Sequence, residues 1–122
     1  MTAVYIYKIL HLMGMALLLT SLAGVASHAA AGGDKASNPA GRSLAIAHGL
    51  GLLLVRVGGF GMLARLGLSI GAGWVWVKIL IWLFFCAATV LPYRSQAVAR
   101  SLPVVLPLII GLAALVALFK PF

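Results

Sequence analysis

The feature that most constrains this chain is a series of four apolar stretches, each long enough to cross a lipid bilayer as a helix. They cover residues 4–26, 44–66, 73–91 and 102–119. Crossing the hydrocarbon core takes about 20 predominantly apolar helical residues. Backbone groups in lipid must find hydrogen-bond partners within the protein, so such segments are helices. We therefore predict an all-α protein, an integral membrane four-helix bundle.

Composition supports a membrane protein rather than a soluble one. Hydrophobic residues make up 64% of the chain and charged residues 8%, whereas about a quarter of the residues of an ordinary soluble domain are charged. At 122 residues the chain forms one unit, so we predict a single membrane domain over 1–122. The stretch 27–43 is rich in Gly, Ser, Asn and Pro, and we expect a flexible loop there.

Two segments share a similar pattern. Residues 4–10 read VYIYKIL and residues 74–80 read WVWVKIL, with Lys8 matching Lys78. One interpretation is a pair of repeated helical hairpins, because the first and third spans would cross the membrane in the same direction.

The charges are almost all positive, with nine Lys or Arg and a single acid, Asp34. Because the cations are scattered along membrane segments, we expect no nucleic acid as a partner. The expected partners are membrane lipids with anionic headgroups, or an acidic protein. The positive-inside rule places both termini on the non-cytoplasmic side, because the opposite side holds more loop cations, namely Lys35, Arg42, Arg94 and Arg100.

Arg56 lies in the middle of the second apolar stretch. Twelve residues into that span it is about 18 Å deep, near the midplane of the bilayer. A charge there costs about 2.5–3.5 kcal/mol on insertion scales and is kept only with a partner. Two interpretations remain open. Either helix carbonyls and a water satisfy Arg56, or the counter-ion comes from outside this chain as a ligand carboxylate, a lipid phosphate or an acid of another subunit.

Helical spacing gathers other polar and aromatic groups near the level of Arg56. One stripe of the first span holds Lys8, His11, Met15 and Leu18, and one stripe of the third holds Trp74, Lys78, Trp82 and Phe85. With Gly49 and Gly59 beside Arg56, these stripes predict a slot with aromatic and glycine walls and a basic floor.

The individual side chains have alternative interpretations. His11 is either a metal ligand or a packed, hydrogen-bonded histidine. Lys8 and Lys78 are either part of the slot or extend to the membrane surface. His28 and His48 lie near the ends of predicted spans, so we expect both at the membrane interface. A copper site formed by His11 with methionines is a further alternative, and its candidates are Met13, Met15 and Met62.

Three segments resemble a known family. YKILHLMG in the first span, GWVWVKILIWLFF in the third and PLIIGLAALVALFKPF at the C-terminus resemble the HemJ-type bacterial membrane protoporphyrinogen oxidases, and more loosely the SirB and CopD-like four-helix families. The resemblance implies the bacterial inner (cytoplasmic) membrane and heme b as cofactor. It also implies His11 as axial metal ligand and Lys78 as its basic partner.

The chain departs from the HemJ pattern at the entry to the last span. The sequence there is RSLPVVLP, without the Asn-Glu pair of the family, and no membrane segment contains a carboxylate that could accept a proton. If the chain is an enzyme, the resemblance implies a protoporphyrinogen oxidase-like oxidoreductase. The more general expectation is a bound heme b or porphyrin, whose propionates would pair with the cations. The candidate residues are His11, Met15, Arg56, Lys78 and Trp82.

The alternative function is that of a non-catalytic accessory subunit. The short loops and the absence of acids fit a chain that docks on other membrane subunits through Arg56 and the glycine faces. We therefore expect a homo-oligomer or a subunit of a larger membrane complex.

Overall fold

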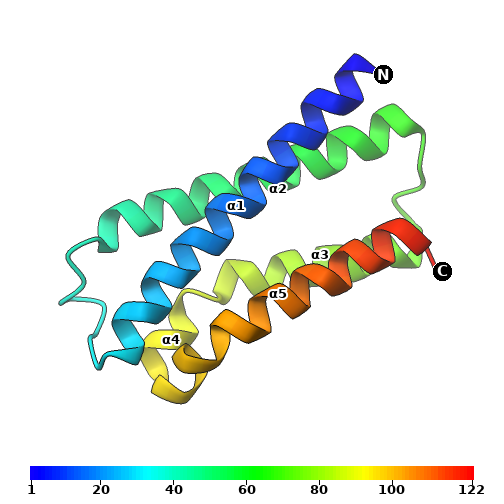
Figure 1. The fold of residues 1–122 in the computed structure, drawn as a ribbon. Helices are drawn as coiled ribbons and strands as arrows, with labels where there is room; N and C mark the ends of the chain where they lie inside the picture. Colours follow the sequence, from blue (N-terminus) through cyan, green and yellow to red (C-terminus); the bar gives the residue numbers. More distant parts are fainter.

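The computed structural model describes all 122 residues and contains helices and connections but no strands. Figure 1 shows the five helices, which are α1 (Thr2–Ala30), α2 (Gly41–Leu66), α3 (Gly73–Ala87), α4 (Val90–Arg94) and α5 (Gln96–Phe119). The all-α prediction is confirmed. Three helices, α1, α2 and α5, are long and apolar enough to cross a membrane, and α3 is a shorter apolar helix.

The predicted third span, 73–91, is interrupted. α3 has 15 residues, a rise of about 22 Å, which is less than the roughly 30 Å of a hydrocarbon core. Pro92 explains the break, because it lacks the amide that would bond to the carbonyl of Ala88, four residues earlier. The chain turns at Ala88 and Thr89 and continues as the short helix α4.

The last helix begins earlier than its predicted start at residue 102. Ser95 precedes α5 in an extended conformation, and its side chain accepts a hydrogen bond from the Val98 amide at 3.3 Å. This is an N-cap, which satisfies one of the free amides of a first turn. Pro103 and Pro107 therefore both lie inside α5.

The connection between α1 and α2 is shorter than the predicted loop over 27–43, because the two helices extend to Ala30 and from Gly41. It is also crossed by hydrogen bonds. The Ser37 amide donates to Asp34 Oδ1 at 2.8 Å, and Asn38 Nδ2 donates to Tyr93 Oη at 3.0 Å. Residues 31–40 are thereby held by hydrogen bonds within the connection and by one hydrogen bond to α4.

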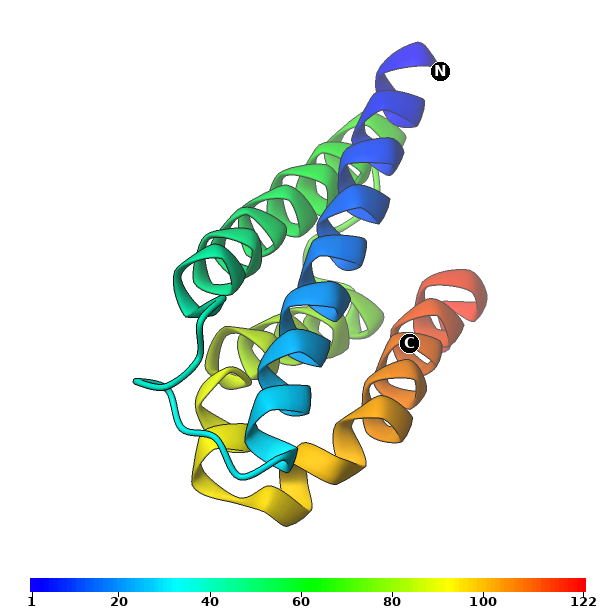
Figure 2. The same ribbon diagram turned by 60° about the vertical axis from the view of Figure 1, so that its left-hand side comes forward.

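The helices form two antiparallel pairs, α1 with α2 and α3 with α5 (Figure 1). In the turned view of Figure 2, α1 lies between α2 and α5, and it packs on both. Both termini and the turn 67–72 lie at one end, called here the terminal end. Residues 31–40 and α4 lie at the other, called the connection end.

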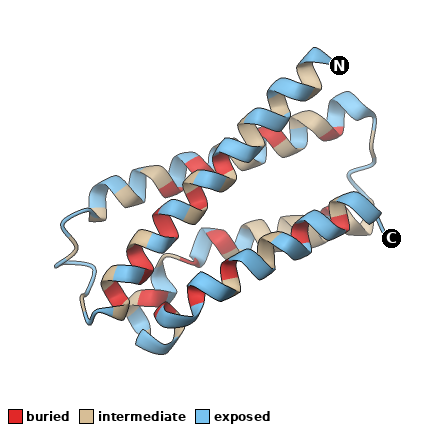
Figure 3. Cartoon of the chain, in the orientation of Figure 1, coloured by how far each residue is buried: buried red, intermediate tan, exposed pale blue.

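The core lies toward the connection end. Figure 3 shows most of the buried residues in the second half of α1 and along one face of α5. The largest buried cluster joins Leu18, Leu22 and Ala26 of α1 to Phe85 of α3 and to Leu102 and Leu106 of α5. α2 and α3 contact each other only sparsely.

Three glycines bring α1 and α2 into backbone contact. A side-chain carbon at Gly58 would lie 2.6 Å from the amide nitrogen of His11 and from the carbonyl oxygen of Tyr7. One at Gly14 would lie 2.6 Å from the Val55 amide nitrogen, and one at Gly51 would lie 2.9 Å from the Gly14 oxygen. Small residues let membrane helices approach this closely.

We predict that Gly58→Ala weakens this helix pair by about 1–3 kcal/mol, the usual cost of overpacking. The atoms in the way are backbone atoms, which cannot move aside without shifting a helix. Gly49→Ala on the same helix is the matched control, because nothing lies within 4 Å of its added carbon. Unfolding of the purified protein in a denaturing detergent, followed by circular dichroism, measures both. Equal stability of the two variants would contradict the proposed contact.

Candidate functional site

Side chains from three helices meet at one turn of α2, Leu52–Arg56. His11 of α1 donates a hydrogen bond from Nδ1 to the Val55 carbonyl at 2.9 Å. Trp82 of α3 donates from Nε1 to the Leu52 carbonyl at 3.0 Å. The guanidinium of Arg56 lies 5.9 Å from the centre of the Trp82 ring, within the range of a cation–π interaction. The structure therefore brings together three of the predicted site residues, His11, Arg56 and Trp82.

The hydrogen bond of His11 determines which ring nitrogen carries the proton. A carbonyl oxygen only accepts, so Nδ1 is the protonated donor and, in the neutral imidazole, Nε2 keeps a free lone pair. The ring is half-buried, and Nε2 has no hydrogen-bond partner within the chain. Histidines that bind metals are usually held in this way, with the other ring nitrogen bound to a carbonyl or carboxylate.

Arg56 has no counter-ion in this chain. Its side chain is exposed and makes no hydrogen bond to a helix carbonyl. The only acid, Asp34, lies in the connection at the far end of the molecule. The first interpretation of Arg56, in which carbonyls of its own chain accept its hydrogen bonds, is therefore not observed in the structure. Trp82 is the one neighbouring group that attracts the charge.

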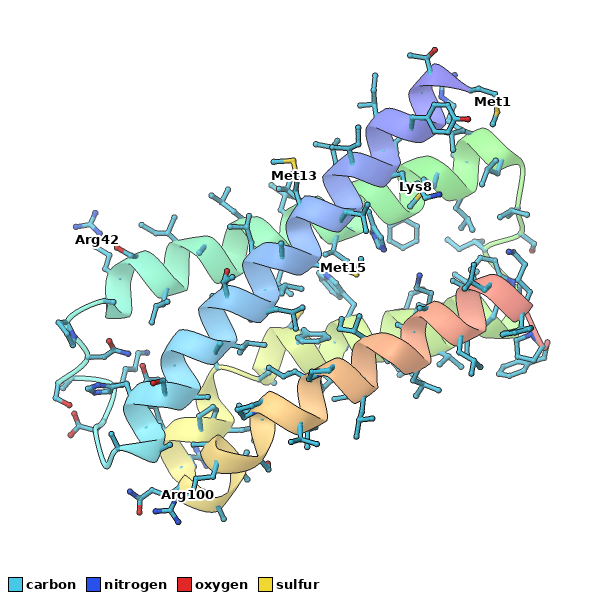
Figure 4. The ribbon with its side chains drawn as sticks, in the orientation of Figure 1. Met1, Lys8, Met13, Met15, Arg42 and Arg100 are labelled. Carbon is cyan, nitrogen blue, oxygen red and sulfur yellow. The ribbon has the colours of Figure 1, made fainter.

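Lys78 lies one helical turn before Trp82 on α3 and is half-buried. Met15 is half-buried on the side of α1 that faces the second pair of helices, and Lys8 is exposed nearer the terminal end (Figure 4). The predicted stripe of α1 therefore faces the region of Arg56 and Lys78.

The expected glycine wall beside Arg56 is only half correct. Gly49 faces open space, whereas a side-chain carbon at Gly59 would lie 3.3 Å from the His11 ring. The glycines that pack most closely, Gly51 and Gly58, lie on the α1 side of α2 instead. Two hollows in the surface lie away from the cluster, one between α3 and α5 and one at the connection end.

The structure separates two of the methionines named for the copper alternative. Met13 and Met15 lie on opposite sides of α1 (Figure 4), and Met13 is 52% exposed. Two residues apart on a helix, they cannot both face the same ion as His11.

His48 is buried inside the protein rather than exposed near the start of α2. His48 is 6% exposed, and its Nε2 donates to the Phe85 carbonyl at 2.8 Å. Phe85 is in the last turn of α3, and its carbonyl also accepts a hydrogen bond from the Ala88 amide at 3.3 Å. His48 thus supplies a second donor to a helix end inside the protein. The sequence alone does not predict this hydrogen bond, because it depends on where α3 ends in the folded structure.

Comparison of the chain with known protein families, with curated proteins and with solved structures finds no match.

We predict that His48→Ala destabilises the fold by about 1–3 kcal/mol, because the buried Phe85 carbonyl loses its side-chain donor. His48→Gln, which keeps an N–H donor, is expected to recover part of this loss. His28→Ala is the control, since the bonds of His28 lie in the exposed connection. Thermal unfolding in mild detergent measures all three. A His48→Ala variant as stable as His28→Ala would show that the bond is dispensable.

Proposed function

We propose that this protein binds a tetrapyrrole, heme b or a porphyrin, against α1, α2 and α3 at the cluster of His11, Arg56 and Lys78. The observation that carries the proposal is His11, whose Nδ1 is fixed by the Val55 carbonyl while Nε2 is left free beside an arginine without an acid. The HemJ resemblance supports two of these residues, His11 and Lys78, independently of the contacts.

The residues fit such a group chemically. His11 would supply one axial nitrogen to a heme iron, and its bond to Val55 would hold the ring in place. Arg56 and Lys78 would pair with the two propionates, whose charges supply the acids that the chain lacks. Trp82 would offer an aromatic face beside the ring system. When bound, heme iron supplies one-electron redox chemistry, and the protein supplies binding and orientation.

The proposal does not include proton abstraction by this chain. A dehydrogenase would need a base near the substrate, and the only carboxylate, Asp34, lies at the connection end. A role in heme handling or electron transfer in a bacterial inner membrane requires only the binding site.

We predict that protein purified in mild detergent from a heme-producing host shows a Soret absorption band, and that His11→Ala abolishes it. His28→Ala is the matched control and should keep the band, because His28 lies in the last turn of α1, at the connection end. Arg56→Gln and Lys78→Gln should each weaken heme binding by about tenfold, the effect of losing one charged hydrogen bond. The measurement is absorbance during titration of the heme-free protein.

Titration with iron-free protoporphyrin distinguishes binding of heme from binding of the porphyrin alone. If the protein binds porphyrin rather than heme, His11→Ala leaves binding unchanged while Arg56→Gln still weakens it. A colourless preparation that takes up neither heme nor protoporphyrin would refute the proposal.

A second candidate function, an accessory subunit, is favoured by one observation on α2. Gly49, Leu53, Arg56 and Phe60 form a stripe along the helix, and all four are exposed. A cation and a glycine on an otherwise apolar exposed face fit the close approach of a helix of another subunit that carries an acid.

This candidate predicts that Gly49→Leu dissociates the protein from a larger complex in native membranes without unfolding it. Gly49 is exposed and an added side-chain carbon there has no atom of its own chain within 4 Å, so an effect on complex size without unfolding points to a neighbouring subunit. Gly111→Leu on α5, also in open space, is the control. Native gel electrophoresis of solubilised membranes measures the size, and migration of the unsubstituted protein as a monomer would exclude this function.

A further inference from the structure

The connection end contains a cavity of about 570 Å³ that plays no part in the His11 cluster. It lies between the first turns of α2, the helix α4 and the connection, with Val25 of α1 at its wall. Its polar lining residues are Lys35, Asn38, Arg42, His48, Thr89, Tyr93 and Arg94. Three of these, one from each of three segments, are cations.

No acid balances the three cations. Lys35, Arg42 and Arg94 are exposed, and none of their side chains makes a hydrogen bond or an ion pair within the chain. Asp34 is next to Lys35 in sequence, but it is not among the lining residues and makes no ion pair with these cations. The backbone and hydroxyl of Ser37 hold the pKa of its carboxyl below the usual value, so it stays ionised and offsets at most one of the three positive charges. The cavity lining therefore keeps an excess of positive charge, which attracts an outside anion.

Hydrogen bonds hold the cavity walls in place. Asn38 donates from Nδ2 to Tyr93 Oη at 3.0 Å, and its Oδ1 accepts from the Ala40 amide at 3.0 Å. Both ends of the Asn38 amide are thus occupied, and the connection is tied to α4. Tyr93 accepts from Asn38 and keeps its own hydroxyl hydrogen for another acceptor.

The start of α2 adds to the positive potential. It has no side-chain cap and no acid in its first turn, so the amides at this helix end have no anionic partner in the chain. The positive end of the helix dipole favours a bound anion at such a place.

The position of the cavity indicates that the anion belongs to a lipid. Arg42 lies in the first turn of the apolar helix α2 and Arg94 ends α4, so the cations lie at the end of an apolar span, where it would meet water. Apolar side chains continue from the cavity along the helix surfaces, with Val90 49% exposed and Ile46 54% exposed. A phospholipid could place its phosphate among the cations and its acyl chains along these side chains.

We propose that this cavity is a binding site for the phosphate-bearing headgroup of an anionic phospholipid, held by Lys35, Arg42 and Arg94. Arginine suits this ligand because its planar fork can bond to two phosphate oxygens at once. The hydroxyl of Tyr93 supplies a further donor. The site is independent of tetrapyrrole binding, which involves the opposite half of α1 and α2.

The test measures binding of phosphatidylglycerol to the full chain in nonionic detergent by native mass spectrometry. Phosphatidylcholine of the same chain length is the zwitterionic comparison. The unsubstituted protein should prefer phosphatidylglycerol, and the double variant Arg42→Gln, Arg94→Gln should bind it at least about tenfold more weakly, the loss of one or two charged contacts. The double variant Arg65→Gln, Arg100→Gln removes the same charge outside the cavity and should change affinity less than about twofold.

Three results would overturn the proposal. Equal weakening in both double variants would mean that net charge, not the cavity, attracts the lipid. Equal binding of the two lipids would show that the site does not recognise the anionic headgroup. Displacement of phosphatidylglycerol by a moderate excess of inorganic phosphate would mean that the cavity takes free phosphate rather than lipid.

A second variant guards against a folding defect. Arg42→Lys, Arg94→Lys keeps the charge but loses the two-pronged geometry, so it should bind phosphatidylglycerol with an affinity between those of the unsubstituted protein and the glutamine variant. If the folded lysine variant binds as weakly as the glutamine variant, positive charge is not what recognises the headgroup, and the proposal fails.

Discussion

The close approach of α1 to α2 is the contact on which the rest of the structure depends. In lipid, apolar side chains gain little by leaving the surrounding acyl chains, so helices associate mainly through tight packing and hydrogen bonds. Gly14, Gly51 and Gly58 allow that packing, because side chains at these positions would collide with the backbone of the facing helix. The same approach brings the His11 ring to the Val55 carbonyl. The geometry of the candidate ligand thus follows from where glycine occurs.

Three aromatic side chains with N–H groups join the helices through backbone carbonyls. His11 and Trp82 reach two carbonyls within one turn of α2, and His48 reaches from α2 to the end of α3. A buried donor without a partner is costly where water is absent, so each bond both satisfies the side chain and fixes the distance between two helices. The α2 turn that carries Arg56 is therefore held from two sides, although α2 and α3 pack only sparsely.

Cations without an acidic partner lie in two separate regions of the structure. Arg56 and Lys78 lie within the apolar helices, and Lys35, Arg42 and Arg94 lie around the cavity at the connection end. With Asp34 as the only acid, neither group can be neutralised internally. An anion inside the membrane and an anion at its surface are different ligands, which is why the tetrapyrrole and phospholipid proposals are separate and can fail separately.

The sequence by itself determined the all-α class, the approximate positions of the long apolar helices and the level shared by His11 and Arg56. Apolar length, helical rise and the scarcity of acids are local properties that any window of the chain displays. Only the tertiary structure decided that Gly51 and Gly58, rather than Gly49, meet α1, that His48 is buried against Phe85, and that Arg42 and Arg94 share a cavity. The physical reason is that lipid-facing and protein-facing surfaces of these helices are equally apolar. Periodicity then cannot reveal how each helix is rotated, which is settled when two helices pack together.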